Sequence, residues 1–192
     1  MGPLMAGAAD LTSRIVVEDS RKPIRVLDIA AGHGLFGIAV AKLCPQATIV
    51  GLDWPNVIEV ARENAKAAGL TERYETIAGD AFKADLLGPY DVVLLPNILH
   101  HFDSATCESL LRRVHAVLVP GGRAVTVEFI PNDDRVTPPE IATFALMMLG
   151  TTPAGDAYTF TELETMARRA GFARSELRSL EPTLQHAVVS YK

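Results

Sequence analysis

Apolar residues follow two different periods along this chain, and the two periods alternate from the N-terminus to about residue 150. Runs of mostly apolar residues are typical of buried strands, whereas apolar residues that recur every three or four positions indicate one face of a helix. Strand-like runs lie at residues 26–29, 48–53, 74–78, 90–95 and 123–130. Helical patterns lie at residues 36–43, 55–68, 104–118 and 140–149. Strands that alternate with helices predict a parallel sheet covered by helices on both faces.

The C-terminal part of the chain departs from this alternation. Thr159 and Glu162 form a capping box that begins a helix, and Gly171 marks its end. Strand-like runs follow at residues 175–180 and 186–191, with only a short loop between them. A parallel return needs a crossover of about a dozen or more residues, so one of these strands must be antiparallel. We predict an α/β fold: a Rossmann-like, doubly wound, mostly parallel seven-stranded sheet with one antiparallel C-terminal strand.

The N-terminal residues predict a further short element. Leu11, Ile15 and Val16 form the apolar face of a helix from about residue 8 to residue 17, and residues 20–23 interrupt it before the first strand. We expect residues 1–23 to form an N-terminal segment and linker, and residues 24–192 to form one domain. A domain of this length can bury a single core.

Composition narrows the classes of partner. The 18 Lys and Arg residues against 23 Asp and Glu residues give a formal net charge of −5, and no basic run is present. Nucleic acid is therefore not an expected partner. No apolar run approaches the roughly 20 residues that span a bilayer, and the N-terminus lacks the basic segment of a signal peptide. Cys44 and Cys107 have no metal-ligand spacing. We expect a cytoplasmic protein that binds neither a metal nor a membrane.

The turn after the first strand is the first candidate for chemistry, because Asp28 is followed there by Ala30, Gly32 and Gly34. Glycines let the backbone approach a ligand, and the next helix directs free N–H groups to the same place. Residues 32–37 match the dinucleotide fingerprint as well as a methyl-donor loop, and this match alone is weak. Asp28 favours the methyl donor, since a carboxylate repels pyrophosphate and attracts a cationic sulfonium with an amino-acid tail. Ala30 fits this turn if its φ stays negative.

Acids also stand at the tips of the second and third strands. Asp53 is placed to accept both ribose hydroxyls of an adenosine, and Asp80 to accept from an adenine amino group. Trp54 either covers the adenine or ribose face or anchors the following helix in the core. Three neighbours of Asp80 complete the predicted adenosine site: Gly79, Ala81 and Phe82. Three acids at three consecutive strand tips are hard to explain as loop caps.

The strand, Asp28 and the glycine turn resemble motif I of class I S-adenosylmethionine-dependent methyltransferases, with Ala30 in place of the first glycine. Nearly the whole chain resembles the catalytic domain of small-molecule O-methyltransferases, the family of the acetylserotonin, caffeic-acid and polyketide-hydroxyl enzymes. The resemblance is carried by residues 26–34, 51–55, 79–82, 97–103 and 120–122, with Glu128 after them. It implies S-adenosyl-L-methionine as methyl donor, S-adenosyl-L-homocysteine as product, and a donor site that comprises Asp28, Ala30, Gly32, Gly34, Asp53, Trp54, Gly79, Asp80, Ala81, Phe82 and Asn97.

In this family the position of His100 is the general base, and the residues support that role. A phenol has an ordinary pKa of about 10 and needs a base near neutrality, for which histidine, at about 6.5, is suited. Glu128, at the end of the fifth strand, is placed to hold the tautomer of the ring. His101 stays a competitor for the role of base. One helix carries residues that either line an acceptor pocket or pack in the core: Phe144, Met147 and Met148.

Two departures from the family pattern bear on the expected assembly and acceptor. Relatives often carry a second glutamate beside the base, where this chain has Ala157. Relatives also have an N-terminal helical domain that dimerises and completes the acceptor pocket, which residues 1–23 do not supply. We therefore expect a catalytic domain that acts on a small-molecule hydroxyl, and a homodimer for a longer chain.

Four other functions compete with this one. Carbon or nitrogen methylation of a quinone-like or amine acceptor would leave His100 less important. Methylation of nucleic-acid bases is disfavoured, because the fourth strand ends in Pro96-Asn97-Ile98-Leu99 instead of Asn/Asp-Pro-Pro-Tyr. A dehydrogenase would bind NAD at the same turn. A structural or regulatory module would bind the methyl donor without catalysis.

Overall fold

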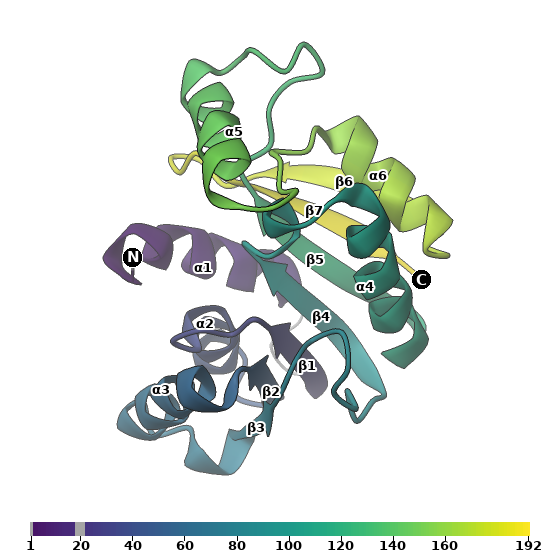
Figure 1. Ribbon diagram of the computed structural model, residues 1–192. Coiled ribbons are helices and arrows are strands. Elements are labelled where there is room, and N and C mark those ends of the chain that lie inside the picture. Colours follow the sequence, from purple (N-terminus) through teal and green to yellow (C-terminus); the bar gives the residue numbers. More distant parts are fainter. Residues whose placement is uncertain (1, 18–21) are drawn as a thin grey trace.

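The computed structural model describes residues 2–17 and 22–192, and this part of the chain forms one sheet of seven strands in the order β3-β2-β1-β4-β5-β7-β6 (Figure 1). The strands are β1 Ile24–Ile29, β2 Ala47–Asp53, β3 Tyr74–Ala78, β4 Tyr90–Pro96, β5 Leu118–Glu128, β6 Arg174–Ser179 and β7 His186–Tyr191. Strands β1 to β5 pair in parallel, whereas β7 runs antiparallel to both β5 and β6. The predicted fold, with one antiparallel C-terminal strand, is confirmed.

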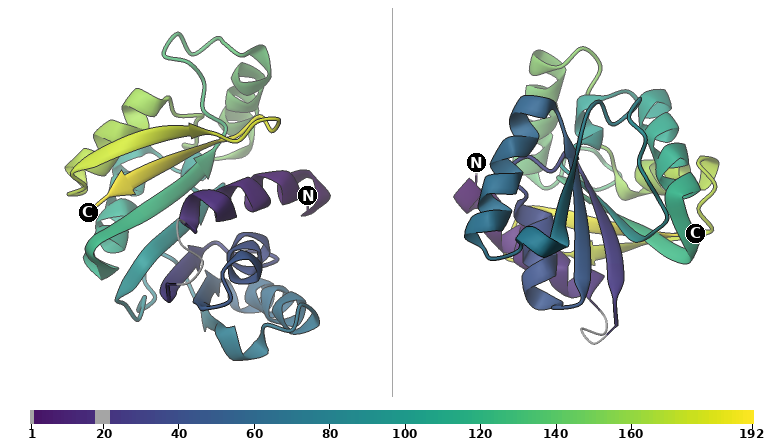
Figure 2. Two further views of the ribbon diagram at one scale, coloured as in Figure 1. Left: turned by 180° about the vertical axis from the view of Figure 1, so that it is seen from behind. Right: turned by 90° about the horizontal axis from the view of Figure 1, so that it is seen from below.

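Helices cover both faces of this sheet (Figures 1 and 2). One face carries α1 Gly2–Val16, α2 Leu35–Leu43 and α3 Pro55–Ala67, and the other carries α4 Ser104–Val117 and α6 Phe160–Arg169. Helix α5, Pro139–Thr151, stands beyond the ends of the strands at the top of Figure 1. Short 3₁₀ turns cover Thr71–Arg73 and Leu99–His101. Because β1, β2 and β4 run parallel, the connections that follow these strands lie at the same edge of the sheet.

The alternation of side chains along each strand explains why there are two cores. In β1, Val26 packs with α1, α2 and α3, whereas Leu27 and Ile29 pack with residues of α4 and α6 on the other face. Both faces of the central strands are buried, which is why these strands read as continuous apolar runs. The same alternation directs Asp28 toward the face that α2 covers.

Two element boundaries differ from the sequence-based expectation. The N-terminal helix begins at Gly2 rather than near residue 8, and Ala8, Ala9 and Val16 lie in the core beside α2. Strand β5 begins at Leu118 and runs through Pro120, Gly121 and Gly122, which were expected to precede it. The register between β4 and β5 shifts at that point, so an irregular strand replaces the expected sharp break.

One further expectation concerns the N-terminal part of the chain, and another concerns membrane-spanning segments. The predicted interruption at residues 20–23 lies partly outside the described residues. Among residues 2–17 and 22–192, no helix has both the length and the apolar character that crossing a membrane requires.

Candidate functional site

A cavity of about 220 Å³ lies at the ends of β1, β2 and β3. Seven of the predicted donor-site residues line it: Ala30, Asp53, Trp54, Gly79, Asp80, Ala81 and Phe82. The sequence did not assign Leu52, Ile98 and Phe102, which complete the wall. Sites for whole drug-sized ligands usually measure about 300–1,000 Å³, so this cavity fits one moiety of a larger ligand, such as a purine base.

The glycine turn has the backbone that the sequence predicts, except at Ala30. Gly32 and Gly34 have φ values of +56° and +74°, and Gly34 is the N-cap of α2. A side chain on Gly34 would meet the hydroxyl of Tyr74 at 2.8 Å. Ala30 has a φ of +57°, so the expectation of a negative φ is wrong. The turn keeps the left-handed geometry that suits glycine and places the alanine in it.

Asp53 closes the first side of the cavity. Its Oδ2 accepts from the N–H of Gly32 at 2.8 Å, and its Oδ1 accepts from the N–H of Trp54 at 2.7 Å. The carboxylate thus ties the glycine turn to the tip of β2. Trp54 is 56% exposed, so it does not anchor α3 in the core, and its side chain lies at the rim of the cavity.

Asp80 closes the opposite side and is held in the same way. Its Oδ1 accepts from the N–H of Phe82 at 2.9 Å, and its Oδ2 lies 3.5 Å from the ammonium of Lys83. The ring of Phe82 packs edge-on against that of Phe102 at 5.0 Å between centroids. The cavity therefore combines apolar walls with two carboxylates that still have free acceptor capacity.

Asp28 is not in the cavity, which corrects the expectation that three carboxylates converge there. Its side chain is fully buried on the α2 side of the sheet, where Oδ2 accepts from the N–H of Gly37 at 2.9 Å. Burial raises the pKa of Asp28 to about 7; the bond from Gly37 opposes this rise and the charge of Asp53 adds to it. Oδ1 has no hydrogen-bond partner among the described residues. A buried acceptor without a partner has the capacity to bind a cationic or protic group.

His100 and Glu128 form a buried pair. The two side chains are almost inaccessible, and His100 Nδ1 lies 2.5 Å from Glu128 Oε2. A carboxylate can only accept, so Nδ1 donates in this contact, and Nε2 is the ring nitrogen that the contact leaves free. The other oxygen of Glu128 accepts from the N–H of Leu99 at 2.9 Å. Ile98 and Phe102, which line the cavity, flank this turn in the sequence.

His101 lies beside His100 in a different environment. The two rings are 4.3 Å apart, but His101 is exposed, and its described contacts include no carboxylate hydrogen bond. Partial burial of its ring lowers the pKa of His101, and the neighbouring His100 lowers it further, whereas Glu128 raises it. Of the two histidines, the structure brings only His100 into contact with Glu128.

Helix α5 brings one of its three candidate acceptor residues into contact with His100. The ring of Phe144 lies 5.0 Å from that of His100 and 4.5 Å from that of Phe129, a residue that the sequence did not single out. Met148 is buried and Met147 is 49% exposed. A cavity of about 590 Å³ runs along α5, but none of these three candidates lines it.

Two other positions differ from what the resemblance implies. Asn97 has a φ of +54°, and its side chain bonds Gln185 and contacts the sulfur of Met5, so the structure does not bring it into the 220 Å³ cavity. Ala157 is buried, and its neighbour Asp156 donates its N–H to the carbonyl oxygen of His100 at 3.1 Å. Because these contacts join residues far apart in sequence, no local pattern indicates them.

Several known proteins with similar sequences are O-methyltransferases. A family model of the O-methyltransferase domain matches residues 7–173. Acetylserotonin O-methyltransferase of Mus musculus is 31% identical over 170 residues, which cover 86% of this chain and 43% of that protein. The 3-hydroxy-5-methyl-1-naphthoate 3-O-methyltransferase of Streptomyces sahachiroi is 32% identical over 157 residues, 81% of this chain and 44% of that protein.

Solved structures of methyltransferases have the same fold as this chain. A candidate O-methyltransferase from Nostoc punctiforme PCC 73102 matches with a TM-score of 0.94 and 54% identity, over 99% of this chain and 57% of that one. Human N-acetylserotonin methyltransferase in complex with S-adenosylmethionine matches with a TM-score of 0.82 and 26% identity, over 97% of this chain and 51% of that one. The chain thus spans about half the length of these relatives.

Proposed function

Because the chain belongs to the O-methyltransferase family, we propose that it binds S-adenosyl-L-methionine and transfers a methyl group to a hydroxyl of a small aromatic or polyketide molecule. In this proposal His100 is the general base. The observation that carries it is the buried contact of His100 Nδ1 with Glu128, beside residues that line the donor cavity. A histidine fixed in this tautomer presents Nε2 as a proton acceptor.

The residues around the cavity fit the proposed donor. Asp53 and Asp80 would bind the adenosine, one at the ribose and one at the adenine, between the apolar walls of Ala81 and Phe82. Trp54 would cover one side. The unpartnered Oδ1 of Asp28 fits a cationic group near the glycine turn. When bound, S-adenosylmethionine supplies an electrophilic methyl group on a sulfonium.

The work of the chain is to align the acceptor and to remove its proton. His100 Nε2 has no hydrogen-bond partner within the described residues and is therefore available to an acceptor hydroxyl. Glu128 holds the ring at Nδ1 and stabilises the imidazolium that forms when Nε2 takes the proton. Such base assistance is typically worth roughly 10² to 10⁴ in rate, and the alignment of the reactants supplies much of the rest.

An aromatic acceptor suits the surroundings of the base. Phe144 packs edge-on against His100, and Phe129 packs against Phe144, so flat apolar surfaces lie beside the imidazole. The similarity to acetylserotonin and naphthoate O-methyltransferases supports the same class of acceptor.

The proposal is tested in two steps on the 192-residue chain. Titration calorimetry should show binding of S-adenosylhomocysteine and none of NAD. Incubation with labelled S-adenosylmethionine and a panel of phenols, naphthols, amines and quinols should transfer label to a hydroxyl. Binding of NAD alone would contradict the assignment of the donor. Donor binding with label only on carbon or nitrogen, or with no transfer at all, would contradict the hydroxyl acceptor or catalysis itself.

A further inference from the structure

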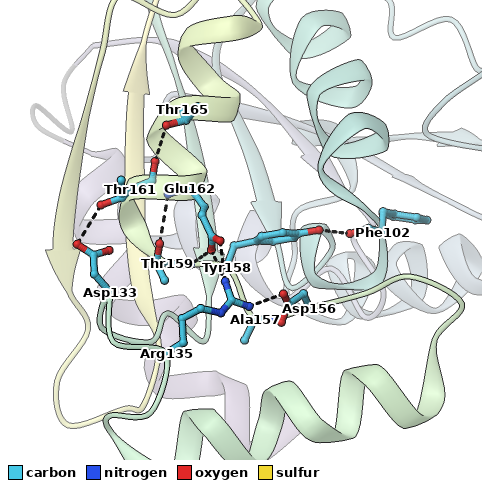
Figure 3. Close-up of polar contacts among 10 residues, drawn as sticks. All are labelled: Phe102, Asp133, Arg135, Asp156, Ala157, Tyr158, Thr159, Thr161, Glu162 and Thr165. Carbon is cyan, nitrogen blue, oxygen red and sulfur yellow. Dashed lines mark hydrogen bonds and ion pairs between the residues drawn. The ribbon is translucent and has the colours of Figure 1, made fainter.

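The loop between α5 and α6 contacts the backbone of the turn that carries His100. The N–H of Asp156 donates to the carbonyl oxygen of His100 at 3.1 Å. The hydroxyl of Tyr158 donates to the carbonyl oxygen of Phe102 at 2.6 Å (Figure 3). A Cβ on Gly155 would lie 2.2 Å from the same oxygen of His100. Loop and turn therefore meet through one backbone bond at His100 and one side-chain bond at Phe102, and only glycine fits where the loop comes nearest to the His100 oxygen.

Arg135 holds this loop from the connection between β5 and α5. Its Nη1 bonds both carboxylate oxygens of Glu162, at 2.6 and 2.7 Å, and its Nη2 bonds Oδ2 of Asp156 (Figure 3). Asp133 adds a bond from the hydroxyl of Thr161 at 3.1 Å. A guanidinium is a planar fork that bonds two carboxylates in one fixed arrangement. Residues 131–138 are thus joined both to the loop and to the first turn of α6.

We propose that Gly155, Asp156 and Arg135 are positioning residues for the base. In this proposal Asp156 fixes the His100 carbonyl through its backbone N–H, and Arg135 fixes Asp156 through its side chain. The inference rests on the proposed role of His100. It extends that role by identifying which distant residues set the place of the imidazole.

The turn that carries His100 is held from two sides. Glu128 fixes it at two points, the N–H of Leu99 and the ring of His100. Neither bond fixes the carbonyl oxygen of His100. Among the described residues, the hydrogen bond to this oxygen comes from the α5–α6 loop. Among the described residues, the bond from this loop to His100 itself comes from the backbone N–H of Asp156, so the loop acts on His100 through its backbone. A misplacement of about 1 Å can cost roughly 10²-fold in rate.

Gly155→Ala is the strongest test. The added methyl must displace the loop from the His100 oxygen, and we expect kcat to fall by roughly 10²-fold. The dissociation constant for S-adenosylhomocysteine should stay within twofold, because Gly155 does not line the donor cavity. An unchanged kcat in the folded variant would overturn the proposal.

Arg135 variants decide the question if Gly155→Ala fails to fold. Exposed ion pairs have modest effects, so Arg135→Ala should lower kcat by about fivefold. Arg135→Lys, which keeps the charge without the fork, should recover part of that loss. Arg168→Ala is the matched control, because this arginine of α6 is also exposed and, among the described residues, forms an ion pair only with Glu164. Equal losses in Arg135→Ala and Arg168→Ala would overturn the proposal.

A measurement without substrate separates this proposal from the proposed function. The ring proton of His100 between Nδ1 and Glu128 should give a downfield proton resonance in the ligand-free protein. We expect Arg135→Ala to broaden or shift it, and Arg168→Ala to leave it unchanged. If the resonance is the same in both variants, the positioning role is wrong even where methyl transfer is observed. If the wild-type chain transfers no methyl group, the proposed function fails while this measurement still reports on positioning.

Discussion

The donor cavity and the turn that carries His100 lie next to each other but are stabilised by different kinds of contact. In the cavity, Asp53 bonds the next residue along the chain and also Gly32, 21 positions away, and Asp80 bonds the residue two positions on. At the turn, His100 bonds Glu128, 28 positions away, and the hydroxyl of Tyr158 bonds Phe102, 56 positions away. Local turn contacts therefore contribute to the proposed donor site, whereas the described side-chain bonds at the turn of His100 join residues far apart in sequence. Changes at one should leave the other largely intact.

The largest expected effect separates the two regions directly. His100→Gln keeps a side chain of similar polarity but removes the base, so we expect kcat to fall by about 10² to 10⁴. The affinity for S-adenosylhomocysteine should stay within twofold, since His100 does not line the donor cavity. Steady-state kinetics and calorimetry measure the two quantities.

His101→Gln is the matched control for this prediction. Its exposed ring has no described bond to a carboxylate. We expect kcat to stay within about threefold, because substitutions of exposed side chains outside a site usually have small effects. A large loss in this variant together with a small loss in His100→Gln would reverse the assignment of the base.

The next prediction concerns Asp28, where stability and donor binding should change in opposite directions. The pKa of Asp28 is raised from an ordinary 3.8 to about 7, so between these values the folded protein holds more protons than the unfolded chain. Stability from this group is therefore lost as pH rises from about 4 to 7. At pH 8 the penalty is at most about 4 kcal/mol by the linkage relation.

Asp28→Asn should remove most of that penalty. We expect an increase of about 2–4 kcal/mol in the free energy of unfolding at pH 8, shrinking to near zero at pH 4, and a weaker affinity for S-adenosylmethionine. Urea unfolding at the two pH values and calorimetry are the measurements. Asp10→Asn, at an exposed position, is the control and should show no such gain. A variant that is less stable than wild type at pH 8 would show that Asp28 does not carry a desolvation penalty.

The same contrast determines how far the sequence predicts this molecule. The mostly parallel sheet follows from the alternation of apolar periods, and its one antiparallel strand follows from the short loop before β7. The donor cavity follows from acids and glycines at strand tips, since parallel strands end at one edge of the sheet. Glu128 was placed correctly beside His100 because β4 and β5 are neighbours.

The features that the sequence does not predict depend on packing. The burial of Asp28 depends on which face of β1 the helix α2 covers, and its position at a strand tip indicates nothing about that face. The contact of Asp156 with His100 joins two loops whose approach depends on the placement of α5. No residue pattern at either position indicates it.

The smallest expected effect tests the one backbone angle that the sequence reading had wrong. An L-residue at positive φ costs roughly 1–2 kcal/mol, and glycine avoids this cost but gains about 0.4–1 kcal/mol of entropy in the unfolded chain. Because Ala30 has a φ of +57°, Ala30→Gly should raise the free energy of unfolding by about 0.5–1 kcal/mol. Ala31→Gly is the matched control: Ala31 is buried, is not among the residues with positive φ, and should lose about 1 kcal/mol. The two changes remove a methyl group from adjacent residues, and the positive φ of Ala30 is the reason to expect opposite signs in a chemical denaturation experiment. Destabilisation of equal size in both variants would mean that Ala30 does not hold the left-handed conformation, and that the turn differs from the one that places Asp53 against Gly32.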